Sequence, residues 1–466
     1  MRRFAGLLVT IALLLAAPAS AADGDLDPAF DGDGIHFYTS PGSYGSSMLR
    51  APDDAVVIWG TRSEATSASE VHWRRIAVGG VGTLCTFTPP GAEYVGARGA
   101  AFDPDGRLLI TVAVDFGAGT VLGVLRVLYP TCDLDPAFDG GFATHALDLG
   151  SEGAMEIAGV AAARWYEPFP IQRRRVLVAI TKAGDGTFVR DTWLARLLDD
   201  GQLDTGFGGG DGVAMIAPER FARGLVATLD GRFLIPGLVQ VIGDNDSFVL
   251  KVDRAGVPDP GFGSGGEAVV DYTPAGQSND ELTRISVAPD GRVVIAGFTD
   301  FDAQPGVFSH RAAIAVLRAD GTPDTSFSGD GRTLTAAFGY ATFATAIAMQ
   351  GDGRILLAAS SQDGPTPLLV EGGDPDRYGH LLRLARNGAI DTSFGTNGRV
   401  DFDWDLVTDG ADGAGGVALA EDGRIWVEGA VETPVSGGTD QRVWVARLVN
   451  SYLFADGFER GSTAAW

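Results

Sequence analysis

A short turn phrase recurs along the chain, and its repetition constrains the fold more than any other feature of the sequence. Clear copies are Leu134–Phe138 (Leu-Asp-Pro-Ala-Phe) and Ile390–Phe394 (Ile-Asp-Thr-Ser-Phe), and a worn copy is Leu84–Phe87. The phrase ends at Phe30, Phe87, Phe138, Phe207, Phe262, Phe327, Phe394 and Phe458. The intervals between these positions are 57, 51, 69, 55, 65, 67 and 64 residues, so eight marks enclose seven units.

A second phrase, Asp-Gly-Arg, occurs once in most units, at 105–107, 230–232, 290–292, 352–354 and 422–424. Unit one has Pro52–Ala55 at this place, and unit three has the basic run Arg173–Arg175. The phrase joins two apolar runs, such as Ile285–Ala288 and Arg292–Gly297. Asp-Gly between two such runs predicts a β-hairpin, because the turn needs a residue with positive φ.

Two further strand-like segments complete each unit. One resembles Trp444–Leu448 and precedes the Phe turn, and the other resembles Gly398–Phe402 and follows it. Four short strands per unit are typical of a β-propeller blade, so we predict an all-β propeller of seven four-stranded blades over residues 22–458. Runs such as Ile355–Ala358 are apolar without alternation, as expected for a sheet covered on both faces. An open β-solenoid is the alternative, and the long four-strand period favours the propeller.

The segment Ile35–Thr39 suggests how the ring closes. It reads as a strand directly after the first Phe turn. If blade boundaries fall after this strand, it pairs into the last blade, in the same sheet as Ile425–Glu428, and removes an open sheet edge. Residues 459–466 would then form a short C-terminal tail.

Residues that return in almost every unit are expected to have the same structural role in every blade. The aspartate of the Phe phrase is expected to accept backbone N–H bonds and stabilise the turn, and the phenylalanine to anchor that turn between blades. A basic residue recurs in the strand before the turn, and we expect it to pair with a repeat aspartate. Its copies are Arg75, Arg126, Arg196, Lys251, Arg383 and Arg447, whereas unit five has Val316 near that place and Arg318 instead.

The phrases Asp391–Gly395, Asn397–Arg399 and Ala288–Gly297 resemble the bacterial delta-60 repeat family. The resemblance covers nearly all of the mature chain and is clearest in units four to seven. It implies an exported, β-propeller-like repeat protein, and it implies no catalytic residue or cofactor. The tail from Leu453 to Trp466 is similar to short C-terminal tails of other exported proteobacterial proteins.

The N-terminus has the features of a secretory signal peptide. Arg2 and Arg3 precede an apolar stretch, Phe4–Ala17, and Ala19–Ala21 is a small-residue cleavage site, so residues 1–21 are expected to be removed. The expected location is therefore periplasmic, cell-surface or extracellular, with no membrane insertion after cleavage. The chain has 35 Lys+Arg and 60 Asp+Glu, a net charge of −25, which argues against nucleic acid as a partner. A monomer is expected, with a protein or glycan of the envelope as its partner.

Cys85 and Cys132 are the two cysteines of the chain. Export places them where disulfides persist, and a bridge between them is a candidate. Two unpaired buried thiols are the alternative, because sequence alone gives no Cα separation.

The search for catalytic motifs finds none: no Gly-x-Ser-x-Gly elbow, no His-Glu-x-x-His pair and no phosphate-binding loop. Five histidines are present, and His72 and His380 lie where other units carry Trp193, Phe248 or Trp444. We interpret these two as aromatic-sized structural residues rather than metal ligands.

The segments that differ between units lie after the Asp-Gly hairpin strand, at Asp300 to His310, Ser361 to Gly379 and Gly243 to Asp246. We expect them to be loops on one face of the ring. The longest carries Asp363, Glu371, Asp374 and Asp376, which are candidate calcium ligands because calcium takes several oxygen donors. No EF-hand pattern is present, and a solvated acidic rim is the alternative.

Three functions remain open from the sequence. The first is an exported binding or scaffold module whose variable loop face holds an unknown ligand. The second is a propeller hydrolase or lyase with carboxylates, alone or together with a cation, at the channel mouth. The third is a purely structural surface protein. The fold does not choose among them, because propellers host unrelated functions.

Overall fold

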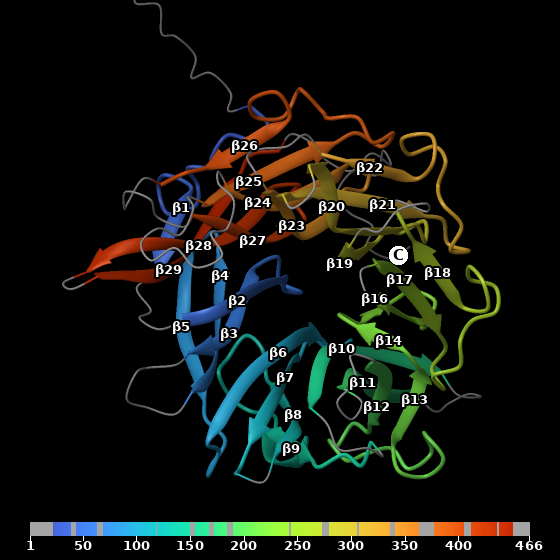
Figure 1. The fold of residues 1–466 in the computed structure, drawn as a ribbon. Coiled ribbons are helices and arrows are strands. Elements are labelled where there is room, and N and C mark those ends of the chain that lie inside the picture. Colours follow the sequence, from blue (N-terminus) through green and yellow to red (C-terminus); the bar gives the residue numbers. More distant parts are fainter. Residues whose placement is uncertain are drawn as a thin grey trace, which may run out of the picture.

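The computed structural model describes residues 22–38, 43–62, 69–117, 119–149, 154–166, 172–183, 190–241, 244–272, 279–304, 307–335, 341–362, 377–404, 412–435 and 438–450. Within this part of the chain, strands form seven antiparallel sheets arranged radially in a ring (Figure 1). The fold is a seven-bladed β-propeller, as the repeat count predicts, and the closed ring excludes an open solenoid.

The first four blades are built from consecutive strands, each sheet ordered from the axis outward. Blade 1 contains β2 (Ser43–Arg50), β3 (Val56–Arg62), β4 (Glu70–Ala77) and β5 (Gly80–Phe87). Blade 2 contains β6 (Tyr94–Phe102), β7 (Leu108–Asp115), β8 (Thr120–Val127) and β9 (Phe142–His145), with the 3-10 turn η1 (Asp139–Gly141) before β9. Blade 3 contains β10 (Met155–Tyr166), β11 (Gln172–Ala183), β12 (Arg190–Leu197) and β13 (Val213–Ala217). Blade 4 has its inner strand broken into β14 (Arg220–Ala222) and β15 (Val226–Ala227), followed by β16 (Phe233–Val241), β17 (Asp244–Val252) and β18 (Glu267–Val270).

The last three blades complete the ring. Blade 5 contains β19 (Asp280–Val287), β20 (Val293–Gln304), β21 (Val307–Leu317) and β22 (Arg332–Leu334). Blade 6 contains β23 (Ala341–Met349), β24 (Ile355–Gln362), β25 (Arg377–Leu384) and β26 (Arg399–Phe402). Blade 7 contains β27 (Gly413–Leu419), β28 (Ile425–Val435) and β29 (Gly438–Leu448), and its outer strand is β1 (Ile35–Tyr38).

The ring closes with the strand that the sequence suggested. β1 pairs antiparallel with β29, with Ile35 opposite Ala446 and Tyr38 opposite Val443, in the sheet that also contains β28. Upstream of β1, the backbone N–H of Asp27 donates to the carbonyl of Arg447 at 2.7 Å. The two ends of the described chain therefore share one blade. With β1 as its outer strand, this blade is a complete four-stranded sheet.

The turns and the core follow from the repeated residues. Glycines of the Asp-Gly-Arg turns have the positive φ that the hairpin requires, from 74° to 86°: Gly106, Gly231, Gly291, Gly353 and Gly423. The central strands are buried on both faces, as at Leu108–Val114, because each blade packs on its two neighbours. Hydrophobic clusters accordingly mix residues of adjacent blades, for example Val124 of β8 with Val178 of β11.

Two segments expected to be loops are β-structure instead. Most of Asp300 to His310 belongs to a long hairpin in which Asp300 of β20 pairs with His310 of β21, and Asp246 lies within β17, opposite Val239. Aspartate and asparagine have low intrinsic β propensity, but continued backbone pairing beyond the body of the blade overrides it. Among the described residues, no helix is long and apolar enough to cross a membrane.

Candidate functional site

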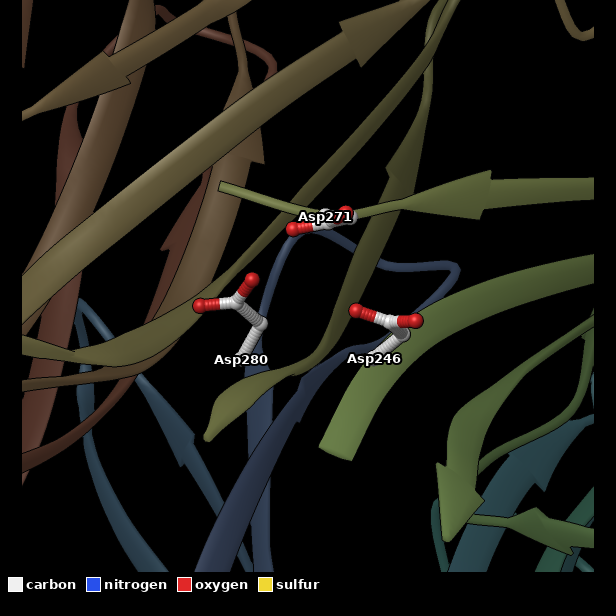
Figure 2. Close-up of side chains that lie close together, drawn as sticks. All are labelled: Asp246, Asp271 and Asp280. Atoms are coloured by element: carbon white, nitrogen blue, oxygen red, sulfur yellow. The ribbon is translucent and has the colours of Figure 1, made fainter. Parts of the chain in front are cut away.

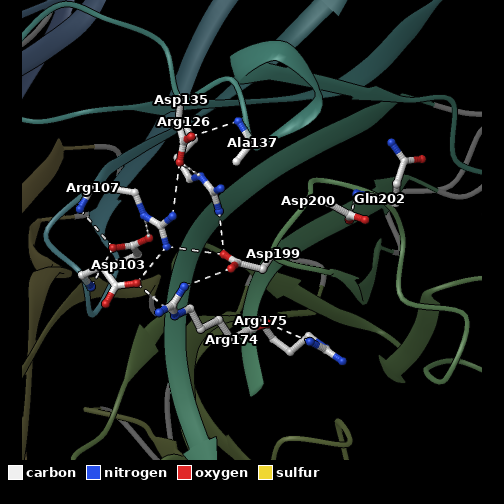
Figure 3. A network of polar contacts seen from close by, with 11 residues as sticks. Asp103, Arg107, Arg126, Asp135, Ala137, Arg174, Arg175, Asp199, Asp200 and Gln202 are labelled. Atoms are coloured by element: carbon white, nitrogen blue, oxygen red, sulfur yellow. Dashed lines mark hydrogen bonds and ion pairs between the residues drawn. The ribbon is translucent and has the colours of Figure 1, made fainter. Parts of the chain in front are cut away.

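The recurring charged residues build one face of the ring, which we call the turn face because the Asp-Gly-Arg and Phe turns meet there. In blade 2, Oδ1 of Asp135 accepts the backbone N–H of Ala137 at 3.0 Å (Figure 3). Its Oδ2 lies 2.9 Å from Nε of Arg126 and 3.2 Å from Nη1 of Arg107 (Figure 3). The Arg126 guanidinium also lies 4.5 Å above the buried ring of Phe138.

The same arrangement returns around the ring, with one aspartate between two basic side chains. The further groups are Asp204 with Arg175 and Arg196, Asp259 with Arg232 and Lys251, Asp324 with Arg292 and Arg318, Asp391 with Arg354 and Arg383, and Asp27 with Arg424 and Arg447. Blade 5 has the loosest group, at 3.8 and 4.0 Å, because Val316 occupies the strand position of the arginine. These contacts confirm the predicted structural role, and they explain the turn face without any ligand.

The opposite face, at which each inner strand begins, is called the loop face. Here the polar groups differ from blade to blade. At the seam between blades 4 and 5, one carboxylate oxygen from each of Asp246, Asp271 and Asp280 lies within 4.8 Å of the other two. Figure 2 shows the three carboxylates facing a common point, with Asp246 on β17, Asp271 just after β18 and Asp280 at the start of β19.

Asp280 has a structural task that recurs in another blade. Its Oδ2 accepts the backbone N–H of Tyr272 at 2.6 Å, and its Oδ1 accepts the hydroxyl of Thr299. Two blades further on, Oδ2 of Asp412 accepts the backbone N–H of Trp404 at 2.8 Å in the same way. This clamp therefore ties an outer strand to the next inner strand, and by itself it indicates no ligand.

Asp246 is the residue that distinguishes the two clamps. Ser247 pairs with Val270 in blade 4 as Gly379 pairs with Phe402 in blade 6, so the register places Tyr378 where blade 4 has Asp246. Only the clamp of blade 4 brings three carboxylates together among the described residues. Carboxylate oxygens are the donors that calcium and magnesium prefer, so this donor set fits a hard divalent cation.

A second polar cluster lies on the blade 5 sheet, on the side that packs against blade 6. Glu281 pairs with Phe298, and Asp300 pairs with His310, so these four side chains share the sheet face that packs toward blade 6. His310 Nδ1 lies 2.7 Å from Asp300 Oδ1, and Phe298 and His310 both contact the ring of Phe343 on β23, with centroids 5.2 and 4.9 Å apart.

The environments of the two carboxyls in this cluster separate their pKa values. Burial raises the pKa of Glu281, and the nearby Asp300 charge adds to the rise, which Arg223 and His310 only partly offset. For Asp300 burial acts in the same direction, but hydrogen bonds from His310 and Asn279 lower its pKa below the ordinary value. Two carboxyls whose pKa values are shifted in opposite directions are the kind of pair that acid–base chemistry uses.

A third polar group, Ser361, His380 and Asp401, is connected like a nucleophilic triad, but its serine is buried away from solvent. Ser361 Oγ lies 2.7 Å from His380 Nε2, and His380 Nδ1 lies 2.6 Å from Asp401 Oδ1. Ser361 is fully buried and His380 is 5% exposed, so no substrate reaches the hydroxyl. His72, at the equivalent place in blade 1, is also buried. The two histidines act as interior structural residues, in agreement with the interpretation from sequence.

The remaining site predictions have two outcomes. Asp363, Glu371, Asp374 and Asp376 all lie outside the described residues, so the cation site predicted there stays a prediction. Cys85 and Cys132 form a disulfide with a Cα separation of 5.5 Å. The bridge joins the end of β5 to the turn after β8 and so links blades 1 and 2.

No protein-family model matches the chain, and no curated protein matches it. Among solved structures, it is similar to polysaccharide lyase Uly1 with 14% identity and a TM-score of 0.45, covering 92% of this chain and 97% of that one. It is also similar to a protein of unknown function from Dyadobacter fermentans DSM 18053, with 12% identity and a TM-score of 0.42, covering 92% of this chain and 98% of that one.

Proposed function

We propose that the protein is a binding module whose loop face is organised by one divalent cation held between Asp246, Asp271 and Asp280. The observation that carries this proposal is the convergence of three carboxylates within 4.8 Å in one seam, with Asp280 fully buried. The repeated blades provide an internal comparison, because the clamp of blade 6 forms without a third carboxylate. The carboxylate of Asp246 therefore has no counterpart in the clamp of blade 6, which supports a ligand role for it.

The electrostatic argument supports a cation. Two unit charges about 4–5 Å apart repel by roughly 3–4 kcal/mol at an effective dielectric constant near 20, and this group contains three such pairs. Protonation of one carboxyl or binding of a cation relieves that repulsion. A hard divalent cation uses all three groups together, and water or backbone carbonyls complete its shell.

The test is thermal unfolding of chelator-treated mature protein, with and without millimolar calcium or magnesium. A cation that binds only the folded state stabilises it by RT ln(1 + [L]/Kd), about 2.7 kcal/mol at a hundred times Kd. We expect a rise in Tm for the wild type and none for Asp246→Asn. Asp403→Asn is the matched control, because Asp403 follows β26 as Asp271 follows β18, and its cation-dependent rise should equal that of the wild type. An equal rise in Asp246→Asn, or none in any protein, contradicts the proposal.

For the cell, we propose an exported protein that presents this face to a protein or glycan of the envelope. The signal-like N-terminus and the resemblance to delta-60 repeats support export. Cleavage between residues 21 and 22, read by mass spectrometry of the protein secreted from an expressing bacterium, tests it. An intact N-terminus and a cytoplasmic location contradict it.

A second candidate function is an acid–base enzyme, a hydrolase or lyase. The observation that favours it is the pair Glu281 and Asp300, whose pKa values are driven in opposite directions beside His310 and an aromatic surface. Release of reducing ends from a panel of neutral and acidic polysaccharides tests this function. We expect cleavage by the wild type and its loss in Glu281→Gln. A panel left uncleaved by the wild type favours the binding function.

A further inference from the structure

The inner strand of blade 2 carries two exposed side chains that set it apart from the other inner strands. β6 slips by one residue against β7, and the skipped residue is Arg98. The same slip occurs in blades 1, 3, 5, 6 and 7, where the skipped residues are Gly45, Ala158, Thr283, Thr345 and Gly415. Four positions before its slip, blade 2 has Tyr94. The corresponding residues of blades 3, 5 and 6 are Ala154, Asn279 and Ala341. Tyr94 and Arg98 are both exposed and have no counterpart in these blades, which supports a role outside the repeated framework.

The ring of Tyr94 lies against the backbone of its own strand. A Cβ atom added at Gly96 would lie 2.8 Å from the Tyr94 hydroxyl oxygen and 3.3 Å from two of its ring carbons. The φ angle of Gly96 is not positive, so the backbone itself does not require glycine there. The missing side chain makes room for the ring, and Tyr94 remains 48% exposed. The start of β6, on the loop face, therefore presents an aromatic surface that the backbone supports.

Two polar side chains of opposite charge accompany this ring. Nη2 of Arg98 lies 3.5 Å from the Tyr94 hydroxyl oxygen, and among the described residues Arg98 forms no ion pair. Asp115 of β7 pairs with Tyr94, so the two side chains leave the same face of the sheet. Oδ1 of Asp115 accepts the backbone N–H of Gly117 at 2.7 Å, which orients the carboxylate. The ring is thus accompanied by one hydrogen-bond donor and one acceptor.

This combination of groups is complementary to a pyranose sugar. The C–H bonds on one side of a sugar ring carry partial positive charge and stack on the negative face of an aromatic ring. Sugar hydroxyls both donate and accept, so a guanidinium and a carboxylate can bond to neighbouring hydroxyls. Charge favours a neutral sugar. The carboxylate of Glu93, which would lie 2.9 Å from a Cβ atom at Gly117, adds a second negative group to this end of the blade, on a chain of net charge −25.

We propose that Tyr94, Arg98 and Asp115 form a binding site for a neutral pyranose residue of a glycan, on the loop face of blade 2. The sugar stacks on Tyr94, and its hydroxyls accept from Arg98 and donate to Asp115. The site rests on the proposed binding function and deepens it by naming a ligand class and the residues that hold it. It lies two blades away from the proposed cation site and uses none of its residues, so either site can fail without the other.

Ligand-observed NMR titration tests the site, with cellohexaose, maltohexaose and chitohexaose as neutral probes and hexagalacturonate as the acidic comparison. One ring and two polar groups bury little surface, so we expect a Kd of about 1 mM for at least one neutral probe. Affinity should fall about tenfold in Tyr94→Ala and about fivefold in Arg98→Gln. Hexagalacturonate should bind more weakly than the best neutral probe.

Gly96→Ala is the sharpest variant, because it changes none of the groups that contact the sugar. The added methyl group displaces the Tyr94 ring from its support, so we expect weaker binding. Tm should change little, because the atoms that the methyl group meets belong to the movable end of a side chain. Tyr94→Phe keeps the ring and should retain most of the affinity. Two controls should bind like the wild type: Leu229→Ala, which removes an 86% exposed apolar side chain from the turn face, and Arg254→Gln, which removes an exposed arginine.

Circular dichroism and Tm establish that each variant is folded. The Asp246→Asn variant, and wild-type protein treated with chelator, should bind the sugar as before, which separates failure of this site from failure of the cation site. The proposal is overturned if no neutral hexasaccharide binds the wild type, or if hexagalacturonate alone binds. It is also overturned if folded Tyr94→Ala binds as tightly as the wild type.

Discussion

Replacing Asp391 with asparagine tests the physical role of the repeated ion pairs. Oδ2 of Asp391 lies 2.8 Å from Nε of Arg383 and 3.0 Å from Nε of Arg354, and Oδ1 accepts the backbone N–H of Ser393 at 3.2 Å. Arg383 is 1% exposed, so removing its partner leaves a buried charge less well compensated. Breaking a buried pair costs roughly 3–5 kcal/mol.

The lower end of that range applies here. Arg383 keeps contacts with Asp23 at 2.9 Å and with Asn450 at 2.8 Å, and the asparagine still offers an oxygen to the Ser393 N–H. We therefore expect a loss of about 3 kcal/mol. With an unfolding entropy of about 2.1 cal/mol/K per residue over roughly 430 residues, this corresponds to a fall in Tm of about 3 °C.

The assay is calorimetric unfolding of the variant beside a matched control. Asp320→Asn is that control, because Oδ1 of Asp320 accepts the N–H and hydroxyl of Thr322 at 2.9 and 2.6 Å but the residue holds no buried arginine. We expect no measurable change in its Tm. If the two variants shift Tm equally, or if Asp391→Asn shifts it by less than about 1 °C, the ion pair is not what stabilises the turn.

Further predictions concern the disulfide and acid stability. Replacing Cys85 and Cys132 by serine should cost about 4 kcal/mol, since the bridge closes a loop over a sequence separation of 47, and equilibrium urea unfolding with and without reductant measures it. Burial opposes ionisation of the Phe-phrase aspartates, yet hydrogen bonds from turn N–H groups and the charges of arginines lower the pKa of four of the six. The folding free energy that these four carboxylates contribute is therefore complete above the unfolded pKa near 4 and is lost as pH falls through their lower folded values. Urea unfolding midpoints measured at pH 7, 5 and 3 should decline in that order. Burial, followed by the charges of Arg62 and Arg74, lowers the pKa of His72 to about 4, so the unfolded chain binds more protons between about pH 4 and 6.5 and stability falls as pH drops through that window. His72→Phe should remove this component, and an unchanged pH profile would show that His72 does not contribute it.

The blade count and the closure of the ring were predictable because they depend on local, repeated chemistry. Each Phe turn needs an aspartate that satisfies its N–H groups and an aromatic ring that buries beneath it, so the period survives differences in loop length. Ile35–Tyr38 was recognisable because an extra strand after the first turn has no blade of its own. The pairing of Arg383 with Asp391 followed from the same periodicity.

The acidic cluster was only partly predictable. The sequence predicts a loop at Asp246, whereas this residue lies in β17. Its proximity to Asp280 depends on the register between two blades, which sequence does not specify. One signal was available: an aspartate followed by an aromatic residue precedes a second aspartate by nine positions at Asp271 and Asp280, and again at Asp403 and Asp412. This spacing marks the clamp between blades, and the third carboxylate appears only in three dimensions.

The binding of a divalent cation by the loop face is the central claim, and calorimetric titration of calcium into chelator-treated protein tests it most directly. The account predicts one site per chain, lost in Asp246→Asn and retained in Asp403→Asn. Binding that is unaffected by Asp246→Asn would contradict it, as would the absence of any heat from calcium or magnesium with the folded wild-type protein.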